Sequence, residues 1–356
     1  MTKRFKRIYL HIGLGKTGSS SIQRFLLDHA AELENTHNIH YPDLGGVDRR
    51  FAGNHSRYLR VLFGSEEETR KVDLLSGRNT REQAQQYRQE VQDNLDSGFE
   101  ASSAEMLLLS AEGAAHLYRP ALASLSRWLQ QLGEEITLIA CIRHPLGALS
   151  SEIQQRLKTG ATLEDLYQSP PHYRFKPMLV KMKEVFPRAD IRVYDFARAT
   201  RHPQGLEAAF ADQLGIEVNV QRSSSARAAN TAMSMEAALV LSSLNRLHPM
   251  VKDNQRNPLR SSGLLHEVTA IPGAKYSAPA AVFSTLAQEV GPQLEWLKAT
   301  YQLELETPKP GAPVDPARYS PRKMDRWARR LVFRHRLRQA FPRLFRTQRR
   351  GRKPTP

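Results

Sequence analysis

The stretch YLHIGLGKTGSSSIQRFL, residues 9–26, places a short apolar run before a loop of Gly, Lys, Thr and Ser, and a helix-like pattern after it. Strand, glycine-rich loop and helix form the order in which backbone N–H groups and a helix N-terminus face an anion. The stretch therefore predicts a phosphate-binding loop at Gly13–Ser21, with the helix beginning near Ser20. The alternative is a glycine-rich turn that binds no ligand.

Two common phosphate loops fit this stretch poorly. Gly15, Lys16 and Thr17 match the end of a Walker A loop, but the position of its first glycine is occupied by Leu10. A dinucleotide-binding fingerprint fits the three glycines at 13, 15 and 18. However, no Asp or Glu ends a second strand about 20 residues later, as that fingerprint requires.

Short apolar runs recur along the chain and alternate with helix-like segments. Continuous apolar strands that alternate with helices indicate a parallel sheet covered on both faces. The fold class predicted is α/β: a P-loop-like three-layer fold with a central, mostly parallel sheet, plus a basic C-terminal tail. The predicted strands are 7–12, 105–110, 136–143 and 190–194, and the main predicted helices are 20–34, 81–95, 114–132, 146–158, 173–186, 234–247 and 281–301.

The order Lys-Thr-Gly-Ser-Ser-Ser-Ile-Gln resembles the 5′-phosphosulfate loop of sulfotransferases that use 3′-phosphoadenosine 5′-phosphosulfate, PAPS. The resemblance implies that Lys16 reaches the oxygen that bridges phosphorus and sulfur. It also implies that the 5′-phosphate is bound by backbone amides and hydroxyls of the residues after it: Thr17, Gly18, Ser19, Ser20 and Ser21. The family's usual Thr-Thr is Ser19-Ser20 here.

A second segment, RHPLGALSSEIQ at 143–154, follows a predicted strand. It resembles the sulfotransferase pattern of an Arg at the strand end, Pro two residues on and Ser eight after the Arg. That pattern gives Arg143, Pro145 and Ser151. A guanidinium offers a planar fork to a phosphate, so Arg143 and Ser151 are predicted to bind the 3′-phosphate of the donor.

Weaker similarity to bacterial carbohydrate-type sulfotransferases brings the motif-level resemblance to about 7–27, 106–154 and 173–247. The acceptor hydroxyl must lose a proton in sulfuryl transfer, and the leaving 5′-phosphate must have its growing charge stabilised. Lys16 is predicted to stabilise that charge.

For the base, two residues are predicted. Glu112 follows a strand in LLLSAEG, at the sheet edge where active sites of open α/β folds lie, and His55 resembles a histidine near the acceptor in several sulfotransferases. The alternatives are a helix N-terminal charge for Glu112 and an ordinary loop histidine for His55. No ligand cluster for a metal is found, and none is required. Residues considered for minor roles are His11 and His144 (structural), Arg227, Asn230 and Ser234 (3′-phosphate pocket) and Tyr173 (acceptor contact).

The formal net charge of +16 lies mostly in one segment. Residues 321–356 carry fourteen Lys and Arg and one acid, a net of +13, so the remaining chain is nearly neutral. A nucleic-acid-binding core is therefore not indicated. The one cysteine, Cys141, excludes a disulfide framework. No apolar run suits a signal peptide or a membrane span, so we expect a cytoplasmic protein.

Five prolines fall within 307–321, which indicates a semi-rigid linker. The predicted organisation is a catalytic domain at 1–306, this linker, and a basic tail at 322–356. The tail interleaves bases with aromatic and aliphatic residues, which suits an anionic membrane surface. RNA binding and a solvated tail are the alternatives.

The leading hypothesis is a sulfotransferase that moves a sulfuryl group from PAPS to a hydroxyl of a carbohydrate or glycolipid by in-line displacement. A P-loop kinase or NTPase is an alternative, and it would require Mg²⁺ and a proper Walker A loop. A non-catalytic nucleotide-binding protein tethered by its basic tail is the other alternative.

Overall fold

The computed structural model describes residues 5–75, 78–171, 174–218, 232–252, 255–308 and 319–341. The chain divides into two compact units, each built from separate segments. The first unit comprises 1–145, 173–226 and 290–307, and the second comprises 146–172, 227–289 and 308–356. The division cuts across the predicted catalytic domain at 1–306, and it assigns the helix α16, Pro321–Ala340, of the predicted tail to the second unit.

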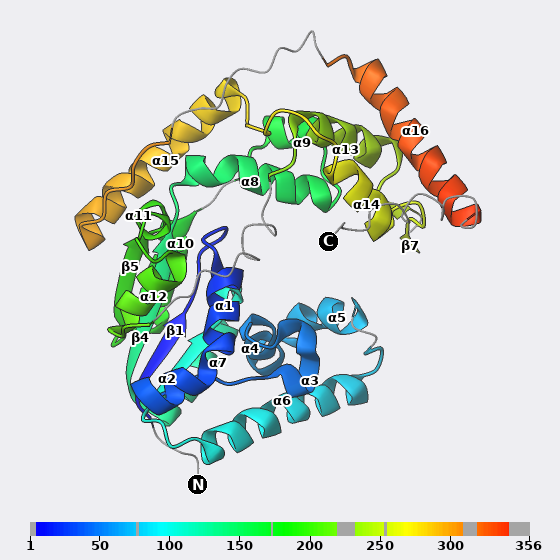
Figure 1. Ribbon diagram of the computed structural model, residues 1–356. Coiled ribbons are helices and arrows are strands. Elements are labelled where there is room, and N and C mark those ends of the chain that lie inside the picture. Colours follow the sequence, from blue (N-terminus) through cyan, green and yellow to red (C-terminus); the bar gives the residue numbers. More distant parts are fainter. Residues whose placement is uncertain are drawn as a thin grey trace, which may run out of the picture. The chain divides into compact units, whose positions relative to one another are not determined.

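A five-stranded sheet forms the centre of the first unit (Figure 1). Its strand order is β2-β3-β1-β4-β5, and every neighbouring pair is parallel. The four apolar runs predicted as strands are thus confirmed, whereas the two-residue β2 was not predicted. The strands are β1 Phe5–His11, β2 Ile39–His40, β3 Met106–Ser110, β4 Gly133–Ile142 and β5 Asp190–Asp195.

Helices cover both faces of this sheet. Ile8 and Leu10 of β1 belong to one apolar cluster, with α4, α6, α7 and α10, while Tyr9 belongs to another, with α1, α2 and α12. This alternation follows from the period-2 geometry of a strand and gives the three-layer α/β fold predicted. The helices of the first unit are α1 Ser19–Asp28, α2 Ala30–His37, α3 Gly45–Asp48, α4 Ser56–Phe63, α5 Glu66–Leu75, α6 Arg81–Ala101, α7 Arg119–Leu132, α10 Phe175–Val185, α11 Phe196–Thr200 and α12 Leu206–Leu214, with short 3-10 turns η1 Arg49–Phe51 and η2 Glu112–His116.

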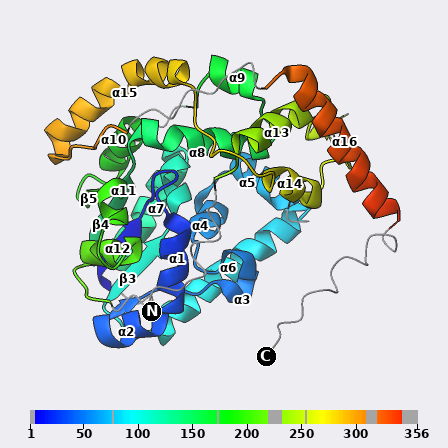
Figure 2. The same cartoon turned by 45° about the horizontal axis from the view of Figure 1, so that its top comes forward.

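The second unit is mainly helical. Within it, α13, α14 and α16 pack together (Figure 2). Its elements are α8 Pro145–Lys158, which begins at the last residue of the first unit, α9 Leu163–Gln168, α13 Met235–Leu247, the hairpin of β6 Val251–Lys252 and β7 Gln255–Arg256, α14 Ser262–Thr269 and α16 Pro321–Ala340; α15 Ala280–Tyr301 contributes residues to both units. Among the helices of the described ranges, none has the length and apolar content that a membrane span requires.

Candidate active site

The loop between β1 and α1 has an unusual backbone. Gly15 and Gly18 have φ angles of 34° and 78°, and Lys16, which has a Cβ, has a φ of 62°. A left-handed conformation is uncommon for a residue other than glycine, and such conformations gather at binding sites, at a cost of about 1–3 kcal/mol. Gly18 also caps α1, and its place is fixed from outside: an added Cβ would overlap Leu206 and lie 3.7 Å from Phe196.

Three buried polar atoms gather at this loop. Thr17 Oγ1, Ser19 Oγ and His11 Nε2 are shielded from solvent, and none has a hydrogen-bond partner among the described residues. Burying a polar group without a partner is unfavourable by about 1–3 kcal/mol, so each such group in a folded protein requires a reason. A ligand with acceptor oxygens would bond to the hydroxyls and supply that reason.

The space around these atoms depends on Gly13. A Cβ added at Gly13 would overlap Ser19 Oγ and would lie 3.3 Å from both His11 Nε2 and the Cβ of Glu112. Glycine therefore keeps the backbone close to all three neighbours. The loop, the end of β1 and Glu112, two residues after β3, thus converge on one point.

Glu112 lies at this point because of the sheet register. His11 of β1 pairs with Ser110 of β3, and the backbone N–H of Ala111 donates to the carbonyl of His11 at 2.8 Å. Glu112 therefore follows β3 at the same sheet edge as the loop, as predicted, and its side chain is half-buried.

Arg143 reaches the loop from the end of β4. Its Nη1 donates to the backbone carbonyl of Lys16 at 3.2 Å, and its guanidinium lies 5.1 Å from the ring centre of Phe196. Burial lowers the pKa of Arg143 from its usual value. Two cationic residues are thus brought together at adjacent strand ends. The sequence predicts that they bind opposite ends of one nucleotide, whereas in the structure Arg143 bonds directly to the loop that contains Lys16.

His11 combines a paired and an unpaired ring nitrogen. Its Nδ1 is 2.8 Å from the hydroxyl of Ser110, and its ring lies 4.8 Å from that of Phe210. Burial lowers the pKa of His11 to about 4, so the ring is neutral at pH 7. The sequence predicts a structural role for His11. Its Nδ1 contact agrees with that role, which does not account for the buried, unpaired Nε2 beside Gly13.

His55 does not have the geometry of a base. Its Nδ1 accepts the backbone N–H of Ser110 at 2.9 Å, so the ring proton lies on Nε2, which donates to the carbonyl of Pro42 at 2.9 Å. Its own backbone N–H donates to the carbonyl of Ser110 at 2.9 Å. The side chain is buried, and burial lowers its pKa to about 4. His55 therefore ties the segment near Pro42 to the end of β3. We correct the catalytic role predicted for it, because both ring nitrogens are already bonded to backbone.

The remaining predicted residues have different environments. Ser20 is exposed at the first turn of α1. The hydroxyl of Ser21 donates to Glu207 of α12 at 2.6 Å, so in this structure it is bonded to a carboxylate. Ser151 lies on α8 in the second unit, and its role at the 3′-phosphate stays a prediction.

Among the residues considered for minor roles, Ser234 caps α13: its Oγ accepts the N–H of Ala237 and donates to the carbonyl of Ile271. Burial lowers the pKa of His144 to about 4. Tyr173, Arg227 and Asn230 lie outside the described residues.

Sequence reasoning missed the residues that hold the loop from the side of β5. Phe196 lies near both Arg143 and Gly18. On α12, Leu206 packs beside Gly18, and Glu207 accepts the hydrogen bond of Ser21. The position of Phe196, directly after a strand at the active edge, is a signal that could have identified it. Glu207 lies 186 residues from Ser21, and no local pattern connects them.

Comparison with known proteins found no family model and no curated protein that matches this chain. Among the solved structures that resemble it are the following two. One, from Alicyclobacillus acidocaldarius, has 14% identity and a TM-score of 0.36 over 72% of this chain and 95% of its own. The other, from the curacin biosynthetic pathway, has 13% identity and a TM-score of 0.32 over 86% of this chain and 100% of its own. Both are described as sulfotransferases. Similarity at this level does not bear on activity.

The geometry supports an anion site. A lysine, an arginine and two buried hydroxyls converge at the N-terminus of α1, where the helix dipole also favours negative charge. Within the described ranges, no group of three or more His, Cys, Asp and Glu side chains is arranged to hold a metal ion.

Proposed function

We propose that this protein is a sulfotransferase that moves a sulfuryl group from PAPS to a hydroxyl of a carbohydrate or glycolipid. The observation that carries the proposal is the contact of Arg143 with the carbonyl of Lys16, beside three buried polar atoms that have no partner among the described residues. A phosphorylated ligand would occupy such a site, and the Lys-Thr-Gly-Ser-Ser order favours PAPS over other nucleotides.

The residues of the loop fit the donor. Thr17 and Ser19 would donate their hydroxyl protons to the 5′-phosphate, and Gly13 leaves the space that this contact requires. Arg143 and Lys16 add positive charge at the same loop. When bound, PAPS supplies the sulfuryl group and the 5′-phosphate leaving group.

Lys16 and Glu112 have separate roles in the proposed transfer of the sulfuryl group. Lys16 stabilises the negative charge that grows on the leaving phosphate. Glu112, which lies beside Gly13, accepts the proton of the acceptor hydroxyl. His55 has no part in the step, because its two ring nitrogens are bonded to backbone.

The acceptor class and the location are also part of the proposal. A carbohydrate or glycolipid acceptor rests on the similarity of LLLSAEG to bacterial carbohydrate-type enzymes. A cytoplasmic location rests on the composition.

Calorimetry in EDTA tests the donor site. We expect adenosine 3′,5′-bisphosphate to bind without metal, and Lys16→Ala to weaken binding by about 10- to 100-fold, since a hydrogen bond to a charged group contributes about 1.5–3 kcal/mol. Lys6→Ala is the matched control, because Lys6 is an exposed residue of β1, the strand before the loop, and is paired with Glu105.

Other outcomes separate the alternatives. A preference for ATP with Mg²⁺ over adenosine 3′,5′-bisphosphate would indicate a kinase or NTPase and would contradict the proposal. Tight binding of adenosine 3′,5′-bisphosphate with no transfer of radiolabelled sulfate to any of a broad set of acceptors would indicate a non-catalytic binding protein.

A further inference from the structure

The basic segment at the end of the described chain is a packed helix. In α16, Met324, Ala328, Leu331 and Val332 are buried, and the helix packs on α13 and α14. Polar contacts fix it at both ends of this interface: Asp325 pairs with Arg246, and His335 contacts both Ser261 and Glu267. One face of α16 is therefore buried against α13 and α14.

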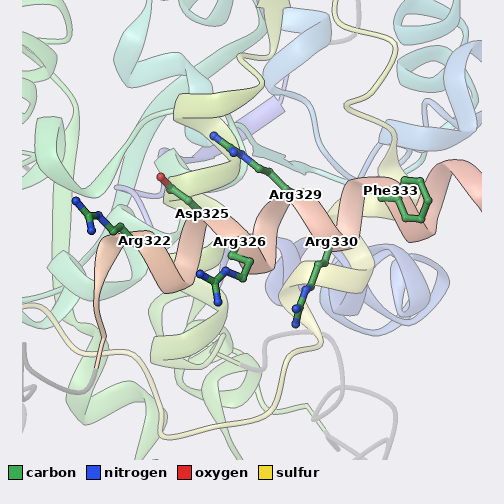
Figure 3. Close-up of a pocket in the computed structure, with 6 residues that line it drawn as sticks. All are labelled: Arg322, Asp325, Arg326, Arg329, Arg330 and Phe333. Atoms are coloured by element: carbon green, nitrogen blue, oxygen red, sulfur yellow. The ribbon is translucent and has the colours of Figure 1, made fainter.

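The outward face of α16 is strongly basic. Arg322, Arg326, Arg329 and Arg330 are exposed and, with Asp325 and Phe333, line a hollow of about 490 Å³ (Figure 3). At 100° per residue these four arginines lie within about 60° of Phe333 on the helical wheel. Asp325, the only acid in the hollow, is at the edge of this face and is already paired with Arg246.

Aromatic side chains stand among these charges. Phe333 is 63% exposed and Phe341, which caps the helix, is 53% exposed. Large apolar side chains gain by leaving water. Phe333 lies on the same face as the arginines, and Phe341 follows at the C-terminal end of α16. A helix with basic residues and exposed aromatics on one side is typical of segments that lie in a membrane interface.

We propose that the outward face of α16 binds an anionic lipid surface, with the four arginines against lipid phosphates and with Phe333 and Phe341 entering the interface. Two observations favour a lipid surface over a nucleic acid as the ligand of this face. The exposed arginines follow one another along a single helix, so a broad anionic surface can contact all of them, whereas single-stranded nucleic acid is bound in a groove that follows its backbone. Phe333, which is 63% exposed, adds an apolar group that a lipid interface can bury, and the arginines pair with the headgroup phosphates.

This inference is independent of the proposed sulfotransferase activity, because α16 and its partners α13 and α14 belong to the second unit and the Lys16 loop to the first. Loss of vesicle binding and loss of nucleotide binding are therefore separate results.

Cosedimentation of the full chain with vesicles tests the proposal. We expect binding to vesicles of phosphatidylcholine mixed with phosphatidylserine, little binding to phosphatidylcholine alone, and a decrease as salt is raised. The double variant Arg326→Glu and Arg330→Glu is expected to reduce binding by about 30-fold or more, given the contribution of each basic residue near such a surface. Phe333→Ser is expected to reduce it by about tenfold.

The control is Arg88→Glu with Arg127→Glu, which changes the net charge equally at exposed sites on α6 and α7. It is expected to bind vesicles as the unchanged protein does, within about threefold. Equal loss in the control, or unchanged binding in the α16 variant, would overturn the proposal. Tighter binding to polyuridylic acid than to the anionic vesicles at the same salt would also overturn it, in favour of a nucleic-acid surface.

Discussion

Two buried clusters lie at the same edge of the sheet, and they differ in whether their polar atoms have hydrogen-bond partners. At the end of β3, His55 satisfies both ring nitrogens and its backbone N–H with Ser110 and Pro42. At the end of β1, Thr17, Ser19 and His11 each bury an atom without a partner among the described residues. The first cluster is complete as folded, whereas the second leaves polar atoms that the proposed ligand would satisfy. Burial and a lowered histidine pKa occur in both, so neither property identifies the functional cluster.

The largest expected effect is on the loop side. Glu112→Gln removes the proposed base and is expected to lower the rate of sulfate transfer by about 10²- to 10⁴-fold. Affinity for adenosine 3′,5′-bisphosphate should not change. Single-turnover transfer of radiolabelled sulfate measures the effect, and Glu105→Gln, near the start of β3, serves as the control. An unchanged rate would remove Glu112 from the mechanism.

On the other side, His55→Ala is expected to act on stability. It leaves the N–H of Ser110 and the carbonyl of Pro42 without partners and opens a cavity, so the free energy of unfolding should fall by about 3 kcal/mol or more. Urea denaturation measures this change. His266→Ala, at an exposed residue of α14, should change it by less than about 0.5 kcal/mol. Folded His55→Ala protein that transfers no sulfate would reinstate His55 as a catalytic group.

Acid should weaken the fold through the same histidines. His11 and His55 have pKa values of about 4 when folded, against about 6.5 when unfolded. Between these values the unfolded chain binds more protons, so stability is full above about pH 6.5 and is lost as the pH falls toward 4. The contribution is on the order of 3 kcal/mol for each histidine. Urea denaturation between pH 7 and 4 should give a shallower dependence for His55→Ala; an identical slope would contradict the assignment.

The smallest expected effect is that of Ser19→Ala, which should not lower stability, in contrast to His55→Ala. Ser19→Ala removes a buried hydroxyl that has no partner among the described residues, so the free energy of unfolding should stay the same or rise by up to about 1 kcal/mol. Affinity for adenosine 3′,5′-bisphosphate should nevertheless fall about tenfold. Thermal melts and calorimetry measure the two quantities, with Ser284→Ala on α15 as an exposed control. A fall in stability as large as that of His55→Ala would show that the hydroxyl has a protein partner.

Local patterns predicted most of the fold. The apolar runs gave four of the five strands of the sheet, because buried parallel strands are continuous hydrophobic segments. The two residues of β2 carry no such signal. The helix predicted at 20–34 divides near His29 into α1 and α2, a break that neither Gly nor Pro marks.

The site was predictable only where strand ends define it. Arg143 beside the Lys16 loop, and Glu112 beside Gly13 of the same loop, follow from the rule that parallel strands present their carboxyl ends at one edge. The role of His55 depends on Ser110, 55 residues away, and on the carbonyl of Pro42. The residues next to His55 in the sequence therefore do not predict these hydrogen bonds. The bond between Ser21 and Glu207 was hidden for the same reason.

The packing of the C-terminal helix α16 on α13 has a practical consequence for shortened versions of the protein. The basic segment after the proline-rich stretch reads as an appendage, yet α16 covers part of α13 through Met324, Ala328, Leu331 and Val332. Ending the polypeptide at residue 306 would leave an apolar strip of α13 in water. Such a protein would tend to aggregate, and its inactivity would say nothing about catalysis.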